Sequence, residues 1–379
     1  MIIFSFLVVL LILYCCLILV YAKWYIAIKP FEITNSYTPS HSFSVIIPAR
    51  NEATNIANCI NSICANNYPT HLYEIIVVDD YSEDETSSIV KQLQQQYSNL
   101  KLVELSEILG ETNLNSYKKK SIEIGIANAV NEFIICTDAD CIVPKNWLMY
   151  FDGFLQKTRA VFVAAPVEFI KQNSLLNDFQ YIDFLAMQSI TAAAVTKGFQ
   201  AMCNGANMAY SRNVFYQVDG FKNIDNIASG DDMLLMQKIK AKFPTRVGYL
   251  FAKEAVVKTP AAPSIKEFLN QRIRWASKSK NYKDFNVLLV LLLVYLLNIS
   301  LALGFIIGLF NISLLVKIFL LIVLKSGVEF YFLDKSKNLF SGFSYLKFLV
   351  LQPFHMVYII LAGWLGYFKK YEWKGRKVQ

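Results

Sequence analysis

Three short apolar runs, each followed closely by charged residues, constrain the fold of this chain more than any other feature. The runs are residues 43–47, 75–78 and 133–135. Each is too short for a helix and rich in β-branched residues, so each predicts a buried strand of a parallel sheet. We expect Pro48 to end the first of these strands.

Helical patterns separate the strands. After the first run, Ile56, Ile60 and Ile63 recur at helical spacing. After the second run, Ser82 and Glu85 match a capping box, which predicts the start of another helix. Strands that alternate with helices indicate an α/β fold with a mostly parallel sheet and right-handed crossovers.

Carboxylates follow two of the predicted strands. Asp79 and Asp80 come directly after the second run, and Asp138 and Asp140 follow the third. The carboxyl ends of parallel strands form the ligand-binding edge of such a sheet. An Asp-x-Asp pair there can hold a hard divalent cation, which in turn can hold a diphosphate. The alternative is that these aspartates only begin turns and helices.

Further motifs follow in the second half of the chain. They are Asn204-Gly205-Ala206-Asn207, Gly220-Phe221, Gly230-Asp231-Asp232 and Gln271-Arg272-Ile273-Arg274-Trp275. Taken in this order with the earlier ones, they resemble the inverting GT-A glycosyltransferases of family 2, which include ceramide glucosyltransferases and processive polysaccharide synthases. The resemblance covers roughly residues 43 to 280. It implies a GT-A catalytic domain with a Rossmann-like, mostly parallel sheet.

The resemblance also implies roles for individual residues. Those that match nucleotide-binding positions are Pro48, Arg50, Glu52, Asp79, Asp80, Lys118 and Lys119, with Asp138 beside them. Tyr117 and Glu123 stand where many members have Gly and Asn. Asp138 and Asp140 match the pair that binds Mg²⁺ or Mn²⁺.

The remaining implied roles concern catalysis and the acceptor. Asp232 matches the catalytic base, and Asp231 replaces the Glu that usually precedes it. The residues that match positions near the acceptor and the leaving diphosphate are Gln271, Arg274, Trp275 and Asn207. The chemistry independently needs such groups: a carboxylate can take the acceptor proton, and a guanidinium fork matches phosphate oxygens. Alternatively, Arg274 and Trp275 are a juxtamembrane anchor pair.

Long apolar segments predict membrane helices at both ends. The chain is 55% hydrophobic, which is high for a soluble protein. Residues 2–22 carry no charge and are long enough to cross a bilayer. We interpret residues 1–23 as an anchor with Lys23 and Lys29 on the cytoplasmic side, and a cleaved signal peptide is the alternative.

Three more apolar segments follow the catalytic region: 287–309, 312–333 and 346–368. Lys317, Lys325 and Glu329 interrupt the second. Charges inside a span usually line a pathway, pair with each other or mark an interfacial segment. Three crossings would place the basic tail outside, against the positive-inside rule. We therefore expect one of the last two segments to be re-entrant or interfacial.

These expectations combine into a four-part organisation. The parts are a transmembrane anchor at 1–23, a cytoplasmic GT-A domain at 40–284, a membrane region at 285–368 and a basic cytoplasmic tail at 369–379. The net charge of +8 suits anionic lipid headgroups, and no nucleic-acid-binding motif is recognisable.

The predicted function is that of a glycosyltransferase in the cell (inner or plasma) membrane. It would move sugar from a UDP- or GDP-sugar to a lipid or lipid-linked acceptor, in the synthesis of cell-envelope glycan or glycolipid. Two alternatives are open: a subunit of a processive polysaccharide synthase, and a non-enzymatic transport or receptor protein.

Overall fold

A computed structural model describes residues 2–110, 115–227, 229–368, 371–373 and 376–378. It divides into two compact units, each built from separate stretches of the chain. The sheet unit consists of Pro30–Ile170, Ala201–Pro260 and Lys370–Gln379. The helix unit consists of Met1–Lys29, Lys171–Gln200 and Ala261–Lys369.

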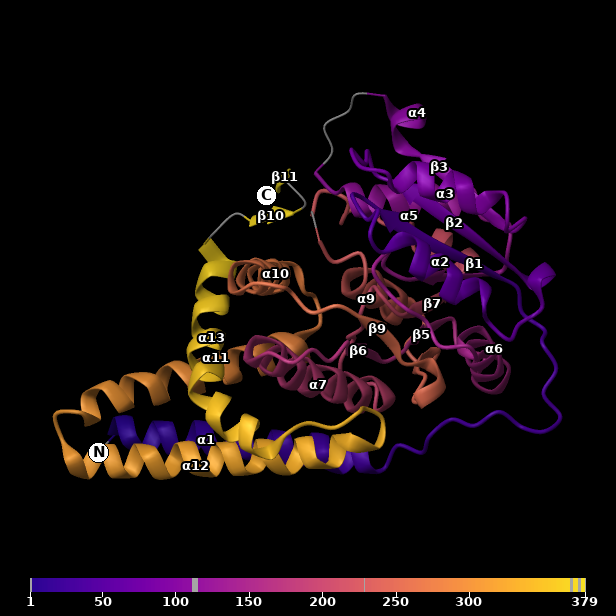
Figure 1. The fold of residues 1–379 in the computed structure, drawn as a ribbon. Helices are drawn as coiled ribbons and strands as arrows, with labels where there is room; N and C mark the ends of the chain where they lie inside the picture. The colour runs from indigo at the N-terminus through magenta and orange to yellow at the C-terminus, as the bar shows by residue number, and fades with distance from the viewer. Residues whose placement is uncertain (1, 111–114, 228, 369–370, 374–375, 379) are drawn as a thin grey trace. The chain divides into compact units, whose positions relative to one another are not determined.

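The sheet unit is built around a seven-stranded sheet in the order β3-β2-β1-β4-β7-β5-β8 (Figure 1). Its strands are β1 (Phe43–Ala49), β2 (Tyr73–Asp79), β3 (Leu100–Glu104), β4 (Phe133–Cys136), β5 (Phe162–Ala164), β7 (Met208–Ser211) and β8 (Val247–Tyr249). All neighbouring strands pair in parallel except at β7, which is antiparallel to β4 and β5. Strands β6 (Val167–Phe169) and β9 (Val257–Thr259) form a small parallel ladder, and β10 (Tyr371–Trp373) and β11 (Arg376–Val378) a hairpin.

The three strands predicted from apolar runs are confirmed as β1, β2 and β4, and the mostly parallel sheet is confirmed with them. The expectation that Pro48 ends the first strand is wrong, because β1 continues to Ala49 and Pro48 pairs with Val78. A proline cannot donate to a ladder. The missing donor is tolerated here because the pairing of β1 with β4 already ends at Ile46.

The helices of this unit are α2 (Ile56–Cys64), α3 (Thr86–Gln94), α4 (Leu105–Leu109), α5 (Tyr117–Ala127), α6 (Trp147–Thr158), α8 (Arg212–Gln217) and α9 (Met233–Lys242), with 3₁₀ turns η1 (Thr70–Leu72) and η2 (Lys253–Ala255). The predicted helix after β1 is α2, whose three isoleucines are all buried. The predicted capping box is wrong. Glu85 itself precedes α3 and makes no side-chain cap bond, and the Ser82 hydroxyl accepts the backbone N–H of Asn51.

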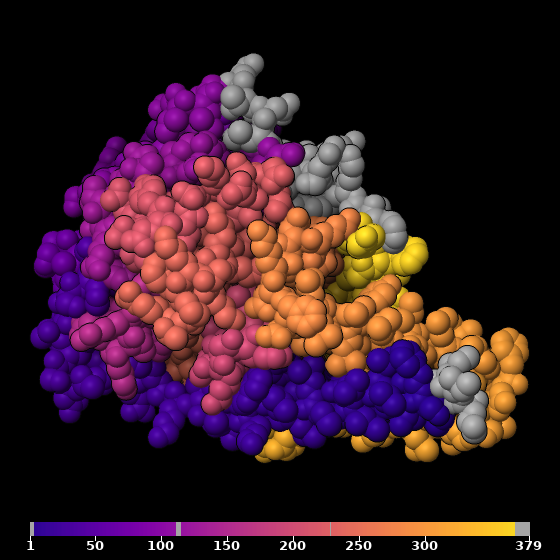
Figure 2. All heavy atoms as spheres, turned by 180° about the vertical axis from the view of Figure 1, so that it is seen from behind, coloured from indigo at the N-terminus to yellow at the C-terminus, as the bar shows by residue number. Residues whose placement is uncertain are grey.

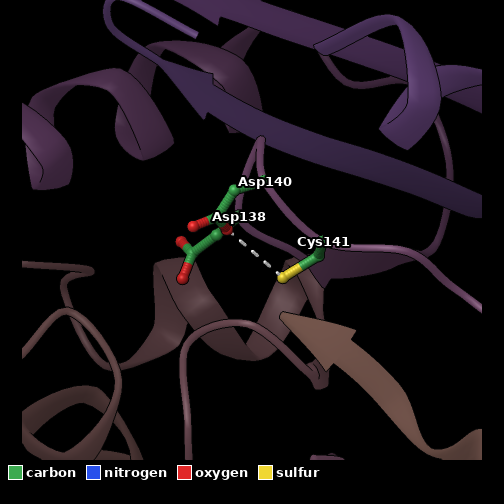
Figure 3. Close-up of side chains that lie close together, drawn as sticks. All are labelled: Asp138, Asp140 and Cys141. Atoms are coloured by element: carbon green, nitrogen blue, oxygen red, sulfur yellow. Dashed lines mark hydrogen bonds between the residues drawn. The ribbon is translucent and has the colours of Figure 1, made fainter. Parts of the chain in front are cut away.

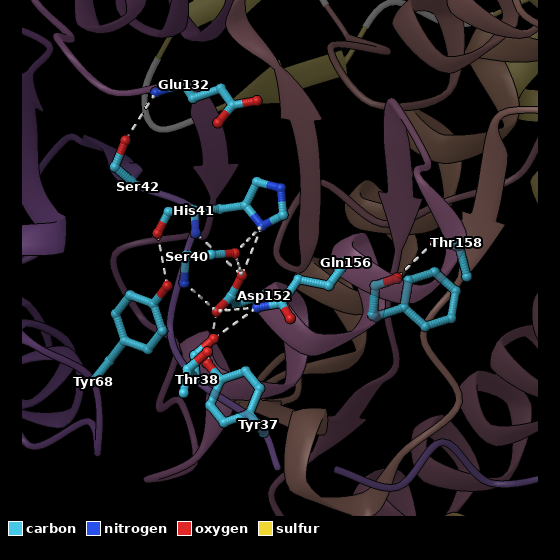
Figure 4. A network of polar contacts seen from close by, with 11 residues as sticks. Tyr37, Thr38, Ser40, His41, Ser42, Tyr68, Glu132, Asp152, Gln156 and Thr158 are labelled. Atoms are coloured by element: carbon cyan, nitrogen blue, oxygen red, sulfur yellow. Dashed lines mark hydrogen bonds and ion pairs between the residues drawn. The ribbon is translucent and has the colours of Figure 1, made fainter. Parts of the chain in front are cut away.

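A polar cluster around Asp152 fixes the segment that leads into β1 (Figure 4). The Asp152 carboxylate is fully buried and accepts hydrogen bonds from the Tyr37 hydroxyl at 2.7 Å and the Gln156 amide at 3.1 Å. The His41 Nδ1 lies 2.6 Å from Asp152 Oδ1. Burial alone would raise the pKa of Asp152, but the hydrogen bonds, that of His41 foremost, lower it to about 2. The cluster therefore holds a charged acid in place beside the sheet.

The helix unit contains α1 (Ile2–Ile26), α7 (Leu175–Thr196), α10 (Ile265–Ser277), α11 (Phe285–Gly308), α12 (Ile312–Lys335) and α13 (Tyr345–Phe368), with 3₁₀ turns η3 (Lys278–Asn281) and η4 (Ser336–Asn338). In the described part of the chain, three helical segments are long and apolar enough to cross a membrane: Phe4–Ile26, Phe285–Gly308 and Tyr345–Tyr367. They correspond to three of the four predicted apolar segments. The fourth forms the helix α12 and falls outside this set.

Helix α1 lies along α12, although more than 300 residues separate their contacting side chains in sequence (Figures 1 and 2). Two of the three charges expected inside α12 pair with each other: Lys325 Nζ lies 2.6 Å from Glu329 Oε1, and both side chains are buried. The Tyr14 hydroxyl of α1 also donates to Glu329. The pairing expected for charges inside an apolar segment is therefore present in the structure.

The compact units divide the chain differently from the predicted linear boundaries. Within the predicted domain 40–284, residues 171–200 and 261–284 pack with the apolar helices instead of with the sheet. The reason is that α7 and α10 pack against α13, where Phe179, Phe268 and Leu351 form a buried cluster. Parts of the predicted tail, residues 369–370, 374–375 and 379, lie outside the described residues.

Candidate active site

The loops that follow β1 and β2 are held together by Arg50, which is 7% exposed. Its Nη1 donates to the backbone carbonyl oxygens of Asp80 at 2.9 Å and Tyr81 at 2.5 Å. Its Nη2 donates to the carboxylate of Glu83 at 3.0 Å. The guanidinium that was predicted to contact a nucleotide therefore shapes the edge of the sheet by fixing the loop after β2.

The acidic end of β2 presents a buried acceptor. Asp79 Oδ2 accepts the backbone N–H of Ser82 at 3.1 Å, whereas Asp79 Oδ1 is buried and has no hydrogen-bond partner among the described residues. Burial raises the pKa of this carboxyl group. Asp80 is also buried, and Glu52 accepts a hydrogen bond from the Asn55 amide at 2.8 Å. A buried acceptor without a donor is one that a ligand hydroxyl or N–H can satisfy.

The Asp-x-Asp pair after β4 forms a candidate metal centre (Figure 3). Ligand atoms of Asp138, Asp140 and Cys141 all lie within 4.8 Å of one another. The Thr259 hydroxyl lies 3.4 Å from Asp140 Oδ1, and the Cys141 thiol lies 3.7 Å from the same oxygen. Burial raises the pKa of the Cys141 thiol, so the carboxylates are the available charged ligands. Hard oxygen ligands of this kind fit Mg²⁺ or Mn²⁺.

A single ammonium group joins this centre to the second acidic pair. Lys118 Nζ lies 2.6 Å from Asp138 Oδ1 and 3.4 Å from Asp231 Oδ2. Burial works to lower the pKa of Lys118, but the charges of Asp138 and Asp231 outweigh it and raise the pKa. Lys118 therefore remains a cation placed between the two acidic groups.

The acidic pair itself lies against the segment that begins at Asn204. A Cβ added to Gly205 would come within 3.1 Å of Asp231 Oδ2 and 3.6 Å of the Asp232 Cβ, so the backbone of this segment lies directly against the acidic pair. Asp232 caps α9, and its Oδ1 accepts the N–H of Met233 at 2.6 Å. Within the sheet unit, the structure thus brings together Asp138, Asp140, Asp231, Asp232 and Lys118.

Two residues predicted to contact ligands have protein partners instead. Lys119 is 2% exposed, and its ammonium donates to three backbone carbonyls in the segment 224–229. Asn207 is fully buried: its amide donates to the carbonyls of Pro166 at 2.7 Å and Ala255 at 2.8 Å, and its oxygen accepts the Trp147 indole N–H at 2.9 Å. The polar atoms of both side chains are thus enclosed and hydrogen-bonded to protein in this structure, and their contact with a ligand stays a prediction.

The Gln271, Arg274 and Trp275 side chains belong to α10 of the helix unit. Gln271 Oε1 is buried without a hydrogen-bond partner among the described residues. Arg274 makes no ion pair within the described part of the chain. The Trp275 ring packs against Phe184 of α7, with 6.0 Å between ring centroids.

The structure also identifies a residue of α10 that the sequence motif does not single out. Arg272 is 2% exposed, and its Nη2 lies 2.8 Å from Asp183 Oδ2 of α7. Its guanidinium carbon lies 4.2 Å from the Trp275 ring centroid. Burial alone would raise the pKa of Asp183, but Arg272 holds it below its ordinary value. A signal available in the sequence was the single acidic residue Asp183 in the otherwise apolar stretch 181–187.

Comparison with known families agrees with this arrangement. The sequence profile of glycosyl transferase family 2 matches residues 44–219, and that of glycosyl transferase family group 2 matches residues 133–366, more than half of the chain. The chain belongs to glycosyltransferase family 2. The first profile includes the Asp-x-Asp pair, and the second extends from β4 through α10 into α13.

Similar curated proteins include other glycosyltransferases. Glycosyltransferase AglE of Haloferax volcanii is 30% identical over 236 residues, which are 61% of this chain and 70% of AglE. The probable glycosyltransferase YdaM of Bacillus subtilis is 28% identical over 238 residues, 62% of this chain and 54% of YdaM. The β-monoglucosyldiacylglycerol synthase of Synechocystis is 30% identical over 113 residues, but the match spans 30% of this chain and only 22% of that enzyme.

Among solved structures, the mannosyltransferase PcManGT from Pyrobaculum calidifontis, in complex with GDP-Man and Mn²⁺, superposes with a TM-score of 0.56. The match covers 96% of both chains at 20% sequence identity. At this identity the similarity concerns the fold, and it agrees with the mostly parallel sheet of the glycosyltransferase.

Proposed function

We propose that this glycosyltransferase is a membrane-anchored, inverting and metal-dependent enzyme. Its donor is a nucleotide-diphosphate sugar, with UDP- and GDP-sugars as the candidates. Its acceptor is a lipid or a lipid-linked sugar, in the synthesis of glycolipid or cell-envelope glycan. PcManGT binds GDP-Man and Mn²⁺, and the Synechocystis relative is a synthase of a glucosylated diacylglycerol, which supports these two classes of substrate.

One observation carries the proposal. The ammonium of Lys118 lies beside both acidic pairs, the candidate metal ligands Asp138 and Asp140 and the candidate catalytic residues Asp231 and Asp232. Asp138 and Asp231 both lie within 3.4 Å of Lys118 Nζ. A donor diphosphate held at Asp138 and Asp140 would therefore lie near Asp231 and Asp232. Proximity of a donor site to a candidate base is what transfer to a hydroxyl group requires.

In the proposed reaction, Asp232 accepts the proton of the acceptor hydroxyl while that oxygen attacks the anomeric carbon of the sugar. The bond between this carbon and the diphosphate oxygen breaks, and the nucleoside diphosphate leaves with the electron pair. Attack from the face opposite the leaving group inverts the anomeric configuration. A divalent ion bound by Asp138 and Asp140 would supply electrostatic stabilisation of the leaving diphosphate. The resemblance to the family implies two further roles, a guanidinium for the phosphate oxygens from Arg274 and a flat apolar face for a sugar ring from Trp275.

The membrane part of the proposal rests on α1, α11 and α13, the helices with apolar, spanning-length segments. We infer that Lys23, at the end of α1, lies on the cytoplasmic side, as does the sheet unit. A processive synthase needs enough helices to line a polar path through the bilayer. Three such segments favour an enzyme that adds one sugar, or very few, to each acceptor.

The base is tested by Asp232→Asn, which preserves shape and removes the proton acceptor. We expect transfer to fall by about 10²-fold or more, while nucleotide-diphosphate affinity is retained. Near-normal turnover would place the base elsewhere, with Asp231 the next candidate.

The acceptor class is tested by incubating the purified enzyme with nucleotide sugars and membrane lipids and then sizing the product. A lipid carrying one or a few sugars supports the proposal. A long polymer made without other subunits would favour a processive synthase, and binding without turnover would favour a non-enzymatic relative.

A further inference from the structure

Lys119 carries a charge into the interior of the sheet unit. It belongs to the first turn of α5, is 2% exposed, and is among the largest fully buried side chains of the protein. Its Nζ donates to the carbonyl oxygens of Ile224 at 2.7 Å, Ile227 at 2.5 Å and Ser229 at 2.9 Å. All three acceptors belong to one segment, 224–229, of which residue 228 lies outside the described residues.

The physical role of such an arrangement is to fix the backbone. A buried ammonium is costly unless its donors are satisfied, and an ammonium has three donors. Three carbonyl oxygens of one segment therefore have to converge on Lys119 Nζ. If the segment moved away, the Lys119 ammonium would remain buried in an apolar interior without hydrogen-bond acceptors.

The fixed segment leads directly into the acidic pair. Ser229, whose carbonyl is bound, is followed by Gly230 with a φ of +87°, and then by Asp231 and Asp232. The positive φ favours glycine here, and a Cβ at Gly230 would in addition come within 2.8 Å of the Leu234 side chain. On the far side, Asp232 caps α9. The two carboxylates are thus held between the carbonyl bound by Lys119 and the start of a helix.

The preceding residue of α5 acts on the same pair from another direction. Side chains of successive helical residues point about 100° apart, since a turn takes 3.6 residues. Lys118 accordingly reaches Asp231 through its side chain, at 3.4 Å, while Lys119 reaches the backbone two residues before it. The start of α5 therefore contacts the acidic pair and also the segment that precedes it.

We infer that Lys119 is a positioning residue for Asp231 and Asp232, and that it acts through the backbone of segment 224–229 and does not bind the nucleotide. The inference rests on the proposed function in one respect, namely that Asp232 is the catalytic base. It replaces the nucleotide-binding role that the sequence suggested for Lys119.

The test compares Lys119→Met with Lys120→Met in the full chain. Lys120 is the next residue of α5, and its Nζ pairs with Glu123 at 2.8 Å on the surface, so its variant controls for loss of a lysine from this helix. For Lys119→Met we expect kcat to fall about 10-fold to 100-fold, as for a displaced catalytic group, with the Kd for nucleoside diphosphate unchanged. Lys120→Met should leave both quantities unchanged.

Hydrogen exchange gives a second readout that does not depend on activity. Backbone amides in 224–232 should exchange faster in Lys119→Met than in the parent protein or in Lys120→Met. If Lys119→Met does not fold, Lys119→Arg serves instead, because a guanidinium keeps the charge but cannot direct three donors from one atom. It should show the same faster exchange and a smaller loss of kcat.

The outcomes separate this inference from the proposed function. A weakened nucleotide Kd with normal exchange in 224–232 would overturn the inference and restore the nucleotide-binding role. Unchanged exchange and unchanged kcat would also overturn it. If Asp232→Asn retains full turnover, the base is elsewhere, yet faster exchange in Lys119→Met would still establish that Lys119 holds the segment.

Discussion

Removal of the Asp183 charge should destabilise the helix unit far more than removal of a similar charge elsewhere on α7. Asp183 is 6% exposed and pairs with Arg272 at 2.8 Å, and His355 Nε2 lies 3.3 Å from its other oxygen. In Asp183→Asn the Arg272 guanidinium would remain buried without its counter-charge. Breaking a buried pair from one side costs about 3–5 kcal/mol of unfolding free energy.

The matched control is Asp178→Asn on the same helix. Asp178 pairs with Lys347 at 2.6 Å, but the two side chains are 24% and 40% exposed. An exposed pair contributes about 0–1 kcal/mol. The two variants should therefore differ by roughly 3 kcal/mol, which is more than a hundredfold in the unfolding equilibrium.

Equilibrium unfolding in detergent micelles, followed by tryptophan fluorescence and circular dichroism, measures both variants. A third variant, Asp183→Leu combined with Arg272→Met, should recover most of the loss because no isolated charge remains. Equal destabilisation by Asp183→Asn and Asp178→Asn, within about 1 kcal/mol, would refute the reasoning that burial decides the cost.

Three further predictions concern the sheet unit. Asp140→Ala should abolish the dependence of nucleotide-diphosphate affinity on Mn²⁺ or Mg²⁺ in calorimetric titrations; equal affinity in the parent protein with and without chelator would exclude a metal-bridged diphosphate. In the absence of nucleotide, Lys118→Met should raise the affinity for Mn²⁺ about fivefold, because it removes a competing cation 2.6 Å from Asp138. Electron paramagnetic resonance measures this affinity, and an unchanged value would contradict the prediction. The hydrogen bond to Asp152 raises the pKa of His41. The substitution His41→Gln should therefore lower the free energy of unfolding by about 1 kcal/mol below pH ~6.5, and this loss should vanish as the pH rises through the raised pKa. Denaturant unfolding measured from about pH 5 to 9 checks the sign of this pH dependence.

The strands and their acidic ends could be predicted because they depend on local patterns. A run such as Ile75-Ile76-Val77-Val78 has few alternatives to a buried strand, and parallel strands bring their carboxyl ends to one edge. The place of Pro48 inside β1 could not be predicted, because the effect of a missing donor depends on which neighbouring strand is paired at that residue.

The direction of individual side chains could not be predicted in the same way. Lys118 and Lys119 are adjacent and chemically identical, yet one lies among carboxylates and the other binds backbone carbonyls. The motif position of Asn207 likewise says nothing about the Trp147 indole that donates to its oxygen. The pairing of Arg272 could not be predicted either, because its partner Asp183 lies 89 residues earlier in the chain. Tertiary contacts decide each of these cases.

The interleaving of the two units along the chain has a consequence for biogenesis and for attempts to shorten the protein. Tyr14 donates to Glu329, so the hydroxyl of α1 has to wait for this partner until the ribosome has produced α12, more than 300 residues later. A chain cut to residues 30–260, intended as a soluble catalytic fragment, would retain 171–200 but lose the α10 and α13 surfaces that cover α7. Such a fragment would expose Asp183 together with apolar side chains and should aggregate. Shortening would have to replace 171–200 with a linker, which the separate core of the sheet unit makes feasible.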